Sequence, residues 1–204
     1  NKKLIIDLEH FFDGFKYDSS YSLKILDILD KYNVYNVTLC DTNGGILPFE
    51  IDTILKYIKQ KFDNLSLGIH CHNDEEMAVA NTLIAINNGV EIVQGTINGI
   101  GERVGNANLI SLIPIVIIKT NYKTSINKNN LTGLKNLSEY LNQILKIENN
   151  KNQPFVGDDS FSHKGGLHLN CIVKKSNAYN HIDPELVGNK MKISMSELSG
   201  KYNI

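Results

Sequence analysis

Four short apolar runs recur along the first half of the chain, each followed by a helical pattern, at a spacing of roughly 25–30 residues. The runs lie at residues 4–8, 34–39, 65–69 and 90–97, and each ends in polar residues or glycine. The first is nearly continuous, as expected of a strand buried on both faces. Parallel strands need helical crossovers, so the repeat predicts an α/β fold with a parallel sheet.

Four strand–helix units are half of what a (β/α)8 TIM barrel requires. They predict either an open sheet or the last four units of such a barrel, and the opening directly on an apolar run at Leu4 favours the barrel. We therefore expect residues 1–120 to form the C-terminal half of a barrel domain. Residues 121–204 lack the repeat and are expected to form a small, mostly helical accessory segment. One helix face is predicted there, made of Leu134, Leu137, Tyr140, Leu141, Ile144 and Leu145.

The charges are balanced, with 21 basic and 22 acidic residues in 204. This composition gives no reason to expect a nucleic-acid or membrane partner. No apolar run reaches the roughly 18 residues of a membrane-spanning helix. Cys40, Cys71 and Cys171 are odd in number and lack metal-type spacing, which fits reduced thiols of a cytoplasmic protein.

A His-x-His pair, His70 and His72, follows the third apolar run. Residues two apart in a strand share a face, so both imidazoles point to one place while Cys71 points away. Neutral imidazoles bind divalent transition metals, and parallel α/β folds place their sites at the carboxyl ends of the strands. The pair predicts a metal site; the alternative is two polar side chains bonded to water or backbone.

Other polar residues at the predicted strand ends have two interpretations each. Asn106, in a glycine-rich loop, is either a metal ligand or a helix cap. Thr42 either contacts a substrate carboxylate or caps its strand end. Glu9 suits a general base or a hydrogen-bond partner of a metal ligand. Glu102 and Arg103 are expected to form a buried ion pair that holds the loop, and a direct part in the chemistry is the alternative.

Long motifs in the chain resemble those of the acetyl-CoA-dependent Claisen-condensing synthases, which include isopropylmalate, homocitrate and citramalate synthases. The motifs are His70–Asp74, Gln94–Leu109, Glu9–Gly14, Leu39–Gly45, Phe161–His168 and Ile182–Asn189. Glu9–Gly14, Leu39–Gly45 and Phe161–His168 resemble the citramalate synthases in particular, and the ending, from Ile182–Asn189 through Ser196–Gly200, agrees. The resemblance covers essentially the whole chain and implies a TIM-barrel catalytic domain followed by an accessory segment.

The resemblance also implies roles for single residues. His70, His72 and Asn106 would bind a divalent metal, either Mg, Mn or Zn. Thr42 would contact the carboxylate of a 2-oxo acid, and Glu9 would be a catalytic carboxylate.

Two further catalytic residues are implied in the accessory segment, His168 and Tyr179. In the family, such residues reach over the barrel of the partner subunit, which implies a homodimer. On the residues alone, both would be surface or packing residues outside the barrel repeats.

The implied reaction condenses acetyl-CoA with pyruvate, giving (R)-citramalate and CoA on the route to isoleucine. The alternatives are a 2-isopropylmalate synthase, an aldol-cleaving lyase and a non-catalytic metal-binding fragment. The lack of cysteine in the Gly-Glu-Arg loop disfavours the lyase.

The chain departs from the family in two places. The motif Asp-Thr-Thr-Leu-Arg-Asp-Gly is absent, so the chain alone is expected to be inactive. In addition, Glu75–Met77 replaces a run of small or apolar residues that includes glycine.

Overall fold

The computed structural model describes the chain except residues 1, 33, 164–170, 173, 176–177 and 194–204. The chain divides into two compact units, Asn1–Leu112 and Ile113–Ile204. The boundary expected after residue 120 stays a prediction.

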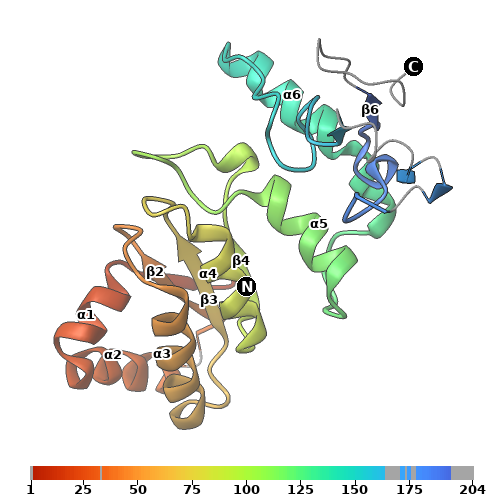
Figure 1. The fold of residues 1–204 in the computed structure, drawn as a ribbon. Helices are drawn as coiled ribbons and strands as arrows, with labels where there is room; N and C mark the ends of the chain where they lie inside the picture. Colours follow the sequence, from red (N-terminus) through yellow and green to blue (C-terminus); the bar gives the residue numbers. More distant parts are fainter. Residues whose placement is uncertain (1, 33, 164–170, 173, 176–177, 194–204) are drawn as a thin grey trace. The chain divides into compact units, whose positions relative to one another are not determined.

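The first unit contains one parallel sheet of four strands in the order β1-β2-β3-β4 (Figure 1). The strands are β1 (Ile5–Leu8), β2 (Asn36–Asp41), β3 (Leu67–Cys71) and β4 (Ile92–Gln94). Each pairs with the next along the chain, as in a barrel of consecutive strand–helix units. The predicted α/β fold is confirmed.

The sheet is curled. β1 and β4 are the outermost strands in the pairing order, and in a flat sheet three spacings of about 4.8 Å would separate them. Nevertheless, Nε2 of Gln94 at the end of β4 donates a hydrogen bond of 2.9 Å to Oδ1 of Asp7 in β1. The side chains of the outer strands meet only if the sheet bends around its concave face, which is the curvature of a barrel.

Helices pack on the outer face of this sheet. They are α1 (Phe11–Tyr17), α2 (Ser19–Lys31), α3 (Pro48–Lys61) and α4 (Ala78–Asn87). A further helix, α5 (Leu109–Lys119), begins in the first unit and continues into the second. The core between the sheet and these helices includes Leu39, Ile69, Ile51 and Leu55, each 0% exposed. α3 begins at Pro48, as predicted, because a first-turn proline loses no helical hydrogen bond.

β1 is not the buried strand that its apolar sequence predicted. Its residues alternate between exposed and half-buried, and Ile5 is 43% exposed. β2, by contrast, is buried along its whole length. The difference lies in the neighbours: β2 has a strand on each side, whereas β1 pairs only with β2 among the described residues.

The described part of the second unit contains short 3-10 helices and strands in addition to an α-helix, so it is less helical than the sequence predicted. Its elements are η2 (Lys128–Gly133), α6 (Leu134–Leu145), β5 (Ser162–His163), η3 (Pro184–Val187) and β6 (Lys192–Ile193). β5 and β6 form a two-stranded parallel sheet. Among the described residues, no helix combines the length and hydropathy that crossing a bilayer requires.

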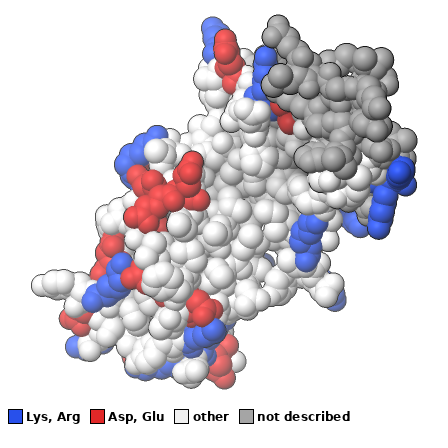
Figure 2. Space-filling model, viewed as in Figure 1, with Lys and Arg blue, Asp and Glu red and all other residues white. Residues whose placement is uncertain are grey.

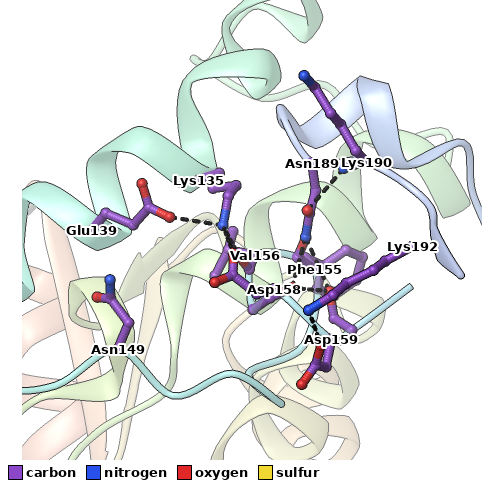
Figure 3. Close-up of polar contacts among 12 residues, drawn as sticks. Lys135, Glu139, Asn149, Phe155, Val156, Asp158, Asp159, Asn189, Lys190 and Lys192 are labelled. Atoms are coloured by element: carbon purple, nitrogen blue, oxygen red, sulfur yellow. Dashed lines mark hydrogen bonds and ion pairs between the residues drawn. The ribbon is translucent and has the colours of Figure 1, made fainter. Parts of the chain in front are cut away.

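Helix α6 buries part of its polar side. Ser138 and Asn142 are 3% and 5% exposed, whereas Leu137 and Tyr140 of the predicted apolar face are 42% and 62% exposed. The buried side is held by Lys135, whose Nζ donates to Oδ1 of Asp158 and to the carbonyl of Val156 (Figure 3). The predicted helix is present, but only part of its predicted apolar face packs. Leu134 is buried and Leu141 is half-buried, whereas the other four residues of that face are exposed.

The side chain of Asn189 is hydrogen-bonded to the loop that follows α6. Its Nδ2 donates to the carbonyls of Phe155 and Gly157 and to Oγ of Ser160, at 3.0, 2.9 and 3.1 Å (Figure 3). The side chain is 5% exposed, so these bonds satisfy a buried amide group. Asn189 therefore connects two stretches of the second unit that lie about thirty residues apart in the sequence.

Candidate metal and substrate site

The concave face of the sheet carries polar side chains toward the carboxyl ends of its strands. His70 is in register with Cys40 on one side and with Gln94 on the other. Because residues in register share a face, the side chains of these three residues project from the same side of the sheet. Ile69 and Cys71 project from the other side, into the helical layer, where both are 0% exposed.

His70 and His72 lie together at the end of β3. Their ring centroids are 5.2 Å apart, and the rings are inclined at 55°. His72 also forms an isolated antiparallel bridge with Asn106, and the N–H of Asn73 donates to the carbonyl of Gly105 at 2.9 Å. The loop after β4 is thereby attached to the histidine pair, and it brings Asn106 alongside.

Asn106 does not act as the helix cap that was the alternative. The cap of α5 is Asn108, whose Oδ1 accepts from the N–H of Ile110. Asn106 instead donates through Nδ2 to the carbonyl of Ile100 at 3.5 Å. This contact leaves its Oδ1 as a buried acceptor without a hydrogen-bond partner.

Nδ1 of His72 is also buried without a hydrogen-bond partner. Two orphaned polar atoms in one place are unusual, because buried polar groups are nearly always paired. Imidazole nitrogen and amide oxygen both suit a divalent cation. Burial lowers the pKa of His72, and His70 and Arg103 lower it further, which favours the neutral form that metal binding needs. The residues present therefore fit a metal ion.

None of the three candidate ligands, His70, His72 and Asn106, carries a negative charge. Among the described residues, no group of three or more His, Cys, Asp or Glu side chains could hold a metal ion. The candidate ligands are two imidazoles and one amide, which fall short of the four ligands that a zinc ion usually takes.

Glu9 and Thr42 are hydrogen-bonded to each other. Oγ1 of Thr42 donates to Oε2 of Glu9 at 2.7 Å and accepts from the N–H of His10, also at 2.7 Å. His10 has a φ of 54°, a left-handed conformation that residues with a Cβ rarely adopt. This strained residue turns the chain from β1 into α1 and places its N–H against Thr42.

Arg103 pairs with Asp74, not with Glu102 as the sequence suggested. Its Nε and Nη2 donate to the two carboxylate oxygens of Asp74 at 2.7 and 2.9 Å, and this pairing lowers the pKa of Asp74. Nη2 also donates to the carbonyl of Thr42 at 2.9 Å. The pair is partly exposed, not buried, and it ties together the loops that follow β2, β3 and β4.

Further acidic side chains lie around Asp74. Figure 2 shows an acidic group over the loops at the carboxyl ends of the strands. Glu75 and Glu76 follow Asp74 and are exposed. Glu76 lies in the turn before α4, not within that helix, and its φ is 58°.

Replacing Glu76 by glycine should stabilise the protein. A left-handed backbone costs a residue with a Cβ roughly 1 kcal/mol more than it costs glycine. We expect Glu76→Gly to raise the free energy of unfolding by about 0.5–1 kcal/mol in urea titrations. Glu75→Gly is the matched control; its backbone has no positive φ, so this change should lower stability. Equal effects of the two changes would contradict the assignment.

Asp41 ends β2 beneath the loop that carries Thr42. It is 2% exposed, and its Oδ2 has no hydrogen-bond partner. Burial raises the pKa of its carboxyl from 3.8 to about 6, although the N–H groups of Ile46 and Gly45 oppose the shift.

Asp41 should make the protein less stable as the pH rises from 3.8 to about 6. With the folded pKa above the unfolded value, the native state binds more protons in this window, so stability is present in full below it and lost across it. Between about pH 4.5 and pH 7 the loss is about 2 kcal/mol. Urea unfolding at these two pH values should show this loss in the wild type relative to Asp41→Asn. Parallel pH dependences would refute the shift.

The structure brings five of the expected site residues into the first unit: Glu9, Thr42, His70, His72 and Asn106. Tyr179 belongs to the second unit. There its ring lies 6.4 Å from that of His163, whose Nε2 is 2.9 Å from Oδ1 of Asn180. His168 lies outside the described residues. The roles of all seven residues stay predictions.

Sequence reasoning missed Asp7, Gln94 and the partner of Arg103. Nδ1 of His70 is hydrogen-bonded to Oε1 of Gln94 at 3.0 Å. Side chains alternate between the two faces of a strand, and Gln94 is a polar residue near the end of the fourth apolar run. This pattern could have indicated that Gln94 faces the histidines on the neighbouring strand. No local signal pointed to the contact of Arg103 with Asp74, which are 29 residues apart.

Known proteins that are similar to this chain belong to the same group of enzymes that its motifs resemble. The family model HMGL-like matches residues 5–137, and the model described as homocitrate synthase post-HMGL domain-like matches residues 155–204. The (R)-citramalate synthase of Aquifex aeolicus is 47% identical over 202 residues, which cover 99% of this chain and 38% of that protein. The 2-isopropylmalate synthase of Bacillus licheniformis is 38% identical over 170 residues, 81% of this chain and 33% of that protein.

Solved structures share the fold. The HMG-CoA lyase of Bacillus subtilis superposes with a TM-score of 0.55 at 19% identity, over 62% of this chain and 44% of that one. The chain spans 38% of the length of the citramalate synthases that it matches. The resemblance inferred from the motifs is confirmed, and the chain belongs to the HMGL-like family.

Proposed function

We propose that this chain is part of an acyltransferase that condenses acetyl-CoA with a 2-oxo acid, preferably pyruvate, to give (R)-citramalate and CoA. The observation that carries the proposal is the histidine pair, with the orphaned Oδ1 of Asn106 beside it. The same stretch lies within the 99% of the chain that matches an (R)-citramalate synthase.

His70, His72 and Asn106 would hold a divalent metal, either Mg, Mn or Zn. When bound, the metal supplies a Lewis acid for the carbonyl of the 2-oxo acid. The chain itself would contribute neutral nitrogen ligands from the end of β3 and a neutral oxygen ligand from the loop after β4. The bridge between His72 and Asn106 holds the two segments together.

The contact between Thr42 and Glu9 suggests how acceptor binding and base activation are linked. A threonine hydroxyl has one hydrogen to donate, and Glu9 takes it at 2.7 Å. A substrate carboxylate that binds Thr42 would have to take this hydrogen bond away from Glu9. Glu9 would then be freed to accept a proton from the methyl group of acetyl-CoA.

His168 and Tyr179 are the other proposed acid–base groups. We propose that they act over the barrel of a partner subunit in a cytoplasmic homodimer, as the family resemblance implies. Tyr179 is 47% exposed.

A 2-isopropylmalate synthase is the second candidate, supported by the 38% identity to a protein of that name. The two activities differ in the acceptor alone. A third possibility is that the isolated chain is a non-catalytic metal-binding fragment, and we expect the isolated chain to release no CoA.

The test is a CoA-release assay on a protein of the relatives' length that contains this chain. Pyruvate, 2-oxoisovalerate and 2-oxoglutarate are compared as acceptors, with and without a chelator. We expect pyruvate to give the highest kcat/KM and the chelator to abolish activity. A preference for 2-oxoisovalerate would assign the second candidate, and CoA release that is insensitive to the chelator would refute the metal site.

A further inference from the structure

A chain of hydrogen bonds runs behind His70, away from His72 and Asn106. Nδ1 of His70 contacts Oε1 of Gln94 at 3.0 Å, and Nε2 of Gln94 donates to Oδ1 of Asp7 at 2.9 Å. Nε2 of Gln94 also lies 3.4 Å from Oγ1 of Thr38. The chain thus links strands β1, β2, β3 and β4 across the concave face.

Donor and acceptor counting fixes the direction of this chain. An ionised carboxylate such as Asp7 accepts hydrogen bonds but donates none. Oγ1 of Thr38 uses its single hydrogen on Oδ1 of Asn36, so toward Gln94 it is also an acceptor. The NH2 group of Gln94 must therefore face Asp7 and Thr38, because the opposite amide orientation would set oxygen against oxygen.

The carboxamide oxygen of Gln94 then faces His70. An oxygen acceptor requires a hydrogen on Nδ1 of His70. In the neutral imidazole the other nitrogen, Nε2, then carries the lone pair. Only an unprotonated nitrogen can ligate a metal.

We propose that Gln94 and Asp7 are positioning residues that hold His70 as the Nδ1–H tautomer and so present Nε2 as the ligand atom. The proposal rests on the proposed metal-binding role of His70 and extends it to two residues outside the expected ligand set. Gln94 orients the imidazole, and Asp7 orients Gln94 from across the curled sheet.

The test compares imidazole tautomers by 15N–1H NMR at about pH 8.5, two units above the ordinary histidine pKa of about 6.5. The wild-type chain should show a hydrogen on Nδ1 of His70. Gln94→Met keeps the side-chain length but removes the acceptor, so Nε2–H should gain population. Asp7→Asn should have a smaller effect in the same direction, because an asparagine can face Gln94 with either end.

Zinc titration supplies a second measurement on the same variants. Gln94→Met should weaken zinc binding by about 10–100-fold, the usual effect of losing a residue that orients a ligand. The matched control is Asn88→Leu, which removes another amide bonded to a carboxylate, that of Asp52, at the far end of α4. The control should leave both the His70 tautomer and the zinc affinity unchanged.

Three outcomes would overturn the proposal: Nε2–H at His70 in the wild type, Nδ1–H retained in Gln94→Met, or an equal effect of Asn88→Leu. A failure of this proposal can be distinguished from a failure of the proposed metal-binding function. A wild-type chain that binds no zinc but keeps Nδ1–H would contradict the metal site while supporting the tautomer assignment.

Discussion

His70→Ala is expected to lower the zinc affinity of the chain at least about 100-fold, beyond the loss usual for residues that only orient a ligand. His70 is one of two imidazoles in the candidate site, and no other group of described His, Cys, Asp or Glu residues could replace it. Isothermal titration with zinc measures the change, and circular dichroism checks that the fold is kept.

His181→Ala is the control for the loss of an imidazole. His181 lies in the second unit, where its ring packs against those of Phe155 and Phe161. This change should leave the zinc affinity as it is. Retained stoichiometric binding in His70→Ala, or an equal loss in His181→Ala, would refute the assignment of His70 as a ligand.

Gly105→Ala is expected to destabilise the first unit by about 3 kcal/mol or more. Gly105 has a φ of 95°, and a Cβ there would overlap the carbonyl oxygen of Gly99. The same loop segment donates from the N–H of Asn106 to that carbonyl and accepts from the N–H of Asn73. Relief of the overlap must therefore move Asn106 away from the histidine pair, so zinc affinity should fall too.

Urea unfolding of Gly105→Ala is compared with that of Gly133→Ala. Gly133 ends η2 and is the N-cap residue of α6, with a φ of −85°, and a Cβ there would meet nothing within 4 Å. Its replacement should be neutral or stabilising by up to about 1 kcal/mol. If the two alanine variants unfolded at the same urea concentration, the tight packing of the Gly105 loop would be disproved.

Much of the first unit followed from local sequence. The apolar runs predicted the four strands, and Pro48 marked the start of α3 because its effect is confined to the helix turn where it lies. The alternation of residues in β3 predicted that His70 and His72 would meet. Such features depend on residues a few positions apart, so they can be inferred from one sequence.

Features that depend on distant partners were missed. The apolar sequence of β1 predicted burial, but burial depends on which elements lie beside a strand. The same reason explains α6, whose polar residues are covered by a later loop while Leu137 and Tyr140 stay exposed. Arg103 bonds to Asp74, although Glu102 is its neighbour in the sequence. Gln94 was overlooked because it contacts His70 only once the strands are in register.

The central claim is that His70 and His72 ligate one metal ion. X-ray absorption at the zinc edge, on the chain loaded with one equivalent of zinc, tests it most directly. The account predicts scattering from two imidazoles and at least one oxygen ligand, at distances of about 2.0–2.2 Å. A spectrum without imidazole scattering, or one dominated by sulfur at about 2.3 Å, would contradict it.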